Sequence, residues 1–127
     1  MRYILGLVAL LASAPASAAD LMLCTVENIY EMSKQGAIQK DLKNASDIIG
    51  GKFKFDRASG FVDGQFIWRE VKWTIVRRGN FNSSWILTSS DERLPLRFTL
   101  TIHTWMKGYP FMLYDVGIGD ISSGSCH

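Results

Sequence analysis

The chain has 127 residues, of which 47% are hydrophobic and 20% charged, and its formal net charge is +2. This length fits one domain, and the composition is that of a folded protein rather than a disordered one. The basic residues form no cluster larger than the pair Arg77 and Arg78. Since nucleic-acid binding needs a basic patch, we expect no nucleic-acid partner.

The first 19 residues have the pattern of a secretory signal peptide. One positive charge at Arg2 precedes a short apolar run, and small residues follow up to Ala19. The apolar run is too short to cross a bilayer permanently, so we expect cleavage of 1–19, no membrane span, and a single β-rich domain over 20–127. The length and the alanine-rich end of this segment predict a periplasmic protein, with secretion into the medium as the alternative.

The next segments predict a strand and then the one helix of the domain. Residues 21–32 can form the first strand, and residues 37–51 show apolar side chains at helical spacing, followed by a glycine pair that ends a helix. The apolar positions of this expected helix are Ile38, Leu42, Ala45 and Ile49.

The segment 51–66, GKFKFDRASGFVDGQF, has the glycines and aspartates of a ligand-binding loop. A calcium loop needs oxygen ligands at positions where this segment has Arg57 and Phe61, and a phosphate loop needs a glycine spacing and a lysine that it lacks. Asp56 can instead cap a turn, and Gly60 can adopt the left-handed conformation that closes one. We therefore predict a hairpin turn here, and no metal site.

The second half of the domain predicts antiparallel strands. Residues 69–77 and 85–90 form a hairpin around polar turn residues, residues 94–107 alternate without interruption, and residues 110–126 add one or two strands. Such a long alternation requires a bent strand or a barrel. Its expected inward side chains are Leu94, Leu96, Phe98, Leu100, Ile102 and Met106, and its expected outward side chains are Arg97, Thr99, Thr101, His103, Trp105 and Lys107.

The cysteines complete the expected fold. An exported chain with an even number of cysteines favours a disulfide, here between Cys24 and Cys126. The fold class that we predict is mainly β: a small antiparallel barrel or sandwich of six to eight strands, with one α-helix after the first strand and the termini joined by the disulfide.

Catalytic residues are scarce. His127 ends the chain, and His103 is a lone strand histidine, whereas a general base needs a positioned partner. No serine lies in a nucleophile-elbow context and no group of ligands has metal-site spacing. We therefore expect a protein that is not an enzyme and carries no cofactor; an enzyme of unknown type that uses His103 with Asp115 or Asp120 is our third hypothesis.

Aromatic residues carry the functional expectation. Most of them must form the core, but alternation places one tryptophan among polar and basic side chains, as in an interaction surface, unless a second layer covers it. We predict a binding or inhibitory module that grips another exported protein through a strand face or loops. The alternative is a carrier that holds a small apolar ligand inside a barrel. The candidate binding residues are Trp105, His103, Lys107, Arg97 and Tyr109.

Overall fold

A computed structural model describes residues 20–64, 72–90 and 97–127; the expected signal peptide lies outside these ranges. The described residues form nine strands and one short helix. These elements are β1 (Leu21–Met32), β2 (Ile38–Lys40), α1 (Ala45–Ile48), β3 (Lys52–Asp56), β4 (Val62–Gly64), β5 (Lys72–Arg77), β6 (Trp85–Ser90), β7 (Phe98–Ile102), β8 (Pro110–Asp115) and β9 (Asp120–Cys126).

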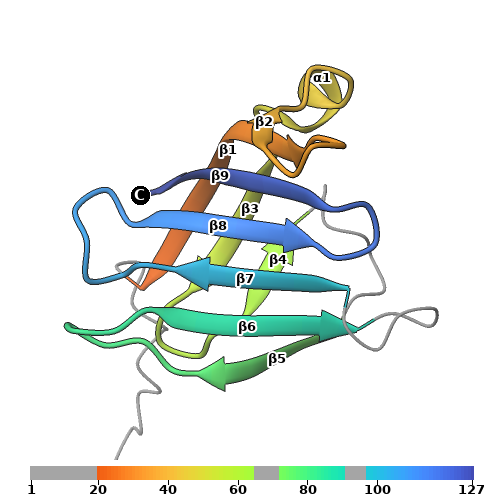
Figure 1. Ribbon diagram of the computed structural model, residues 1–127. Helices are drawn as coiled ribbons and strands as arrows, with labels where there is room; N and C mark the ends of the chain where they lie inside the picture. The colour runs from red at the N-terminus through yellow and green to blue at the C-terminus, as the bar shows by residue number, and fades with distance from the viewer. Residues whose placement is uncertain (1–19, 65–71, 91–96) are drawn as a thin grey trace, which may run out of the picture.

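All the strands belong to one antiparallel sheet, in the order β4-β3-β1-β9-β8-β7-β6-β5, with β2 paired to the end of β1. Figure 1 shows this sheet curled so that β1, β3 and β4 lie behind the hairpins formed by β5 to β9. The predicted fold class is therefore confirmed: the protein is mainly antiparallel β, in a nearly closed barrel.

The core lies inside this curled sheet. Along β7, β8 and β9 alternate residues are buried, as period-two alternation predicts. Two edge-to-face contacts cross the interior: Phe53 of β3 meets Phe111 of β8 at 4.9 Å, and Phe55 of β3 meets Trp85 of β6 at 5.3 Å between ring centroids. Strands that are distant in the sheet order thus pack against each other, which is what closure around a core requires.

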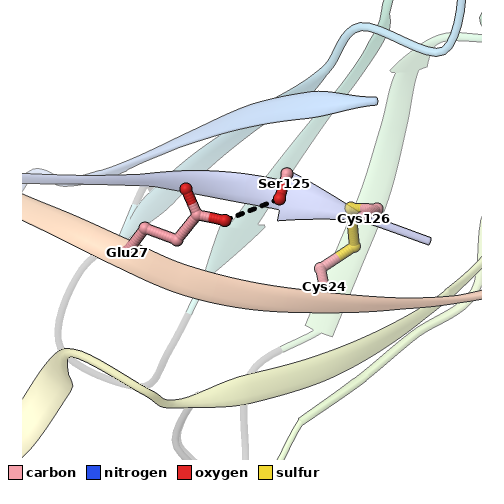
Figure 2. The surroundings of a disulfide bond; sticks show 4 residues. All are labelled: Cys24, Glu27, Ser125 and Cys126. Carbon is pink, nitrogen blue, oxygen red and sulfur yellow. Dashed lines mark hydrogen bonds between the residues drawn. A yellow bond between two sulfur atoms is a disulfide. The ribbon is translucent and has the colours of Figure 1, made fainter. Parts of the chain in front are cut away.

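The predicted disulfide is confirmed. Cys24 and Cys126 are bonded and lie directly opposite each other in the β1–β9 pairing (Figure 2). Leu23 and His127 exchange two backbone hydrogen bonds of 2.8 and 3.0 Å just beyond the bond. Both ends of the described domain are therefore held in one ladder.

The segment between β3 and β4 is a turn, as the sequence predicts. The Asp56 carboxylate accepts a hydrogen bond of 2.9 Å from the Ala58 amide, and Gly60 adopts a positive φ of 80°. The backbone hydrogen bond from Ala58 also holds the pKa of Asp56 below its usual value. This carboxylate thus supports the turn as an Asx cap.

The predicted helix over 37–51 is mostly wrong. Its first part is the strand β2, and only the four residues of α1 are helical. Between the two, the Asp41 carboxylate accepts hydrogen bonds from the backbone amides of Lys43 and Asn44, which fixes a turn instead of a helix. The apolar side chains of Ile38, Leu42 and Ile49 are exposed. Their helical spacing therefore does not mark a buried helix face.

The predicted strand over 94–107 is shorter than the alternation suggests. Residues 94–96 lie outside the described ranges, β7 ends at Ile102, and the chain then turns. Gly108 and Tyr109 adopt positive φ angles in this turn, 78° and 42°. Met106, which we expected to point inward, is therefore exposed.

Candidate binding surface

Three turns meet at one end of the barrel: residues 57–61 between β3 and β4, residues 78–84 between β5 and β6, and residues 103–109 between β7 and β8. We call this set of residues the loop end. The last two turns open to the left in Figure 1. Hydrogen bonds of the Ser84 hydroxyl with His103 and Trp105 join these two turns. Arg78 joins the turn 57–61 to them by donating to the Ala58 carbonyl at 2.6 Å.

A buried serine holds the half-exposed tryptophan of the loop end. Ser84 is only 6% exposed, and its hydroxyl accepts a hydrogen bond of 2.9 Å from the Trp105 indole nitrogen. The same hydroxyl bonds to His103 Nδ1 at 2.5 Å, and the His103 and Trp105 rings meet edge to face. The Trp105 side chain is 50% exposed, so one end of the ring is fixed while much of its surface faces solvent.

Further apolar side chains project from the same turns. Phe81 lies in the β5–β6 turn and is 95% exposed, and Phe61 and Met106 are exposed in the other two turns. On the adjoining strand β5, Val76 is exposed as well. Large apolar groups grouped in this way are the usual mark of an interaction site.

Basic side chains are exposed in the same turns and at the end of β5. Arg77, Arg78 and Lys107 are exposed, and the Arg78 guanidinium lies 4.9 Å from the centre of a Trp85 ring. The nearby carboxylates are engaged locally: Asp20 pairs with Arg57 at 3.4 Å, and Asp56 caps its own turn. The loop end and the adjoining end of β5 therefore expose both apolar and basic side chains.

The structure brings four of the five predicted site residues together. His103, Trp105, Lys107 and Tyr109 lie in the single β7–β8 turn. Arg97 does not join them, because it precedes the opposite end of β7 and pairs there with Asp115 at 3.1 Å. The five predicted residues therefore do not form one cluster, because Arg97 lies apart from the other four.

Sequence reasoning missed Phe81 and Ser84. A phenylalanine within the polar turn RRGNFNSS cannot reach a core, and that signal could have identified Phe81. Ser84 carries no sequence signal, because its role depends on the pairing of β6 with β7, which brings it beside His103.

The third hypothesis finds no support in these contacts. His103 bonds to a hydroxyl, whereas Asp115 pairs with Arg97 and Asp120 accepts from Asn44. The chain matches no family model, no curated protein and no solved structure.

A group of carboxylates lies where β1 and β9 meet the β2–α1 segment. Glu31, Asp41 and Asp120 bring carboxylate oxygens within 4.8 Å of one another. The Asn44 amide donates to Asp41 at 2.9 Å and to Asp120 at 3.3 Å. The hydrogen bond from Asn44 lowers the pKa of Asp41, whereas burial, with Asp41 next to it, raises the pKa of Asp120 to about 6.

These shifts predict how stability depends on pH. Burial raises the pKa of Asp120 to about 6 in the folded protein, whereas in the unfolded chain this pKa has the ordinary aspartate value of 3.8. The contribution of Asp120 to the free energy of unfolding is therefore greatest below about pH 3.8 and is lost as the pH rises through about 6. We expect a lower urea midpoint at pH 7.5 than at pH 5. Asp120→Asn should reduce this difference between the two midpoints. An unchanged difference in that variant would exclude Asp120 as its cause.

Proposed function

We propose that this protein is an exported binding module that docks onto another protein through its loop end. The observation that carries the proposal is the half-exposed Trp105 ring, whose indole nitrogen is held by the buried Ser84 hydroxyl. Binding energy at interfaces is concentrated in a few tryptophan, tyrosine and arginine side chains, and an anchor that is already ordered loses less entropy on binding.

The surroundings of Trp105 fit the same role. Phe81 and Met106 add exposed apolar area in the same turns, and the exposed basic side chains would pair with acidic groups on the partner. The disulfide fits a non-reducing compartment, and the expected signal peptide favours the periplasm. Among the described residues no helix has the length and apolar character needed to span a bilayer.

The alternative of a carrier with its ligand inside the barrel has less support. The two ring contacts of Phe53 with Phe111 and Phe55 with Trp85 cross the interior in which such a ligand would lie. Those buried rings act as core in the described part of the domain.

Photo-crosslinking in the producing cells tests the proposal. We would place p-benzoylphenylalanine at position 81, and at position 54 as the control, because Lys54 is exposed on the outer side of β3. Position 81 should yield a discrete protein adduct that position 54 does not, and Trp105→Ala should remove it. Adducts with lipid only, or equal adducts at both positions, would contradict a protein partner at the loop end.

Alanine variants then measure how much the Trp105 side chain contributes to binding. Trp105→Ala should weaken binding of the captured partner by about 2 kcal/mol or more in calorimetry, because it removes the fixed ring. Its melting temperature should stay close to that of the wild type, since the ring is half exposed. The matched control is Trp85→Ala, whose buried ring should cost about 3–5 kcal/mol of stability. A similar stability loss in both variants would mean that Trp105 belongs to the core.

A further inference from the structure

A groove of about 500 Å³ lies on the outer face of the sheet, over β7, β8 and β9. Its floor is formed by side chains that point away from the core, among them Thr99 and Thr101 of β7 and Met112 and Tyr114 of β8. These residues lie opposite one another in the ladder, Thr99 with Tyr114 and Thr101 with Met112. The floor is thus a continuous patch.

The hairpin of β1 and β2 supplies a wall. Met32 and Ile38 are directly paired in this hairpin, and both line the groove. Met32 is 65% exposed and Met112 is 46% exposed. Apolar side chains from two separate parts of the sheet therefore face a common space and remain largely uncovered.

The lining restricts the chemistry of an occupant. None of the described lining residues is charged. The hydroxyls of Thr99, Thr101 and Tyr114 make no side-chain hydrogen bond within the described ranges, so they can donate to or accept from a ligand. Two methionines and a tyrosine offer polarisable and aromatic contacts that suit a ring.

We infer that this groove binds a small, uncharged aromatic compound that carries a hydrogen-bonding group. The volume falls in the range of about 300–1,000 Å³ that is usual for small-molecule sites. An ionic compound would meet no opposite charge in the described lining, and a purely apolar one would leave the three hydroxyls without partners. This site lies outside the barrel, in contrast to the interior carrier site that the sequence suggested.

Fluorescence titration with N-phenyl-1-naphthylamine, an uncharged aromatic amine, tests the inference, and 1-anilinonaphthalene-8-sulfonate serves as its anionic counterpart. We expect saturable binding with one site per chain, and weaker binding of the anion. Met112→Glu and Met32→Glu each place a charge at an exposed position of the groove, so the melting temperature should not change. The affinity for the amine should fall by about tenfold or more, because its ring would lie against a charged group.

The control is Phe81→Ala, which removes an exposed apolar side chain at the loop end. Loss of dye binding in this control, or unchanged affinity in both glutamate variants, would overturn the inference. Concentration-dependent dimerisation that Met112→Glu abolishes would also overturn it, because the groove would then hold a second copy of the chain. Crosslinking from position 81 should be the same in Met112→Glu as in the wild type. Dye binding thus tests the groove, and crosslinking tests the proposed function, independently of each other.

Discussion

Gly124→Ala should lower the free energy of unfolding by about 3 kcal/mol, at the upper end of the usual cost of overpacking. Gly124 is buried in β9, where it lies opposite Val26 of β1 and Phe111 of β8. A β-carbon at this position would lie 1.9 Å from the Thr25 carbonyl oxygen and 2.9 Å from the Phe111 ring. Because the nearest obstacle is backbone, β1 and β9 would have to move apart.

Urea denaturation of Gly124→Ala and of Ser123→Ala measures this effect. Ser123 precedes Gly124 in β9 and points to the other face of the sheet, so its replacement adds no atom to the barrel. We expect the Ser123→Ala midpoint to stay close to that of the wild type. Similar midpoints for both variants would show that β1 and β9 can separate at Gly124 without cost. If Gly124→Ala does not fold under ordinary conditions, the same variant at low temperature in a stabilising osmolyte should still be less stable than Ser123→Ala.

The strands and the disulfide follow from local properties of the sequence. Alternation marks the core positions of β7, because Phe98, Leu100 and Ile102 are all buried there. The disulfide follows from an even cysteine count in a chain that is expected to carry an export signal, with no knowledge of the sheet. Both inferences need no knowledge of how the strands pair.

The helix prediction failed because spacing alone does not show whether a core is present. Ile38, Leu42 and Ile49 have helical spacing, yet the segment projects from the barrel and these side chains face solvent. Local hydrogen bonds to the Asp41 carboxylate fix a turn. A long-range hydrogen bond supports this turn, because Asn44 also donates to Asp120, 76 residues further along the chain. No local pattern contains that contact.

The candidate site was predicted only in part, for a related reason. Alternation continues through His103 and Trp105 although the strand has ended, so these residues were assigned to a face when they belong to a turn. The Gly108-Tyr109-Pro110 sequence is the signal that limits the strand. The partners of Trp105 depend on sheet pairing, and so does the groove over β7 to β9.

The double variant Cys24→Ala/Cys126→Ala should lose about 2–5 kcal/mol of stability, as is usual when a small exported domain loses its disulfide. The bond joins residues 102 positions apart, so it constrains nearly the whole described chain when the protein unfolds. Chain entropy sets an upper limit of about 4–5 kcal/mol for a loop of that length, and the loss on removing a disulfide is usually smaller. Urea denaturation under oxidising conditions measures the loss against the wild type.

The alanine variant changes packing as well, because both sulfur atoms belong to the buried core. The reduced wild type separates the two effects, because it loses the covalent link and keeps both sulfur atoms in the core. Reduction should therefore account for most of the loss, and the remaining difference between reduced wild type and double variant should be about 1–2 kcal/mol, as expected for a small cavity. If reduction leaves the midpoint unchanged, the β1–β9 ladder holds the ends without the bond. The two backbone hydrogen bonds between Leu23 and His127 would then be part of what secures them.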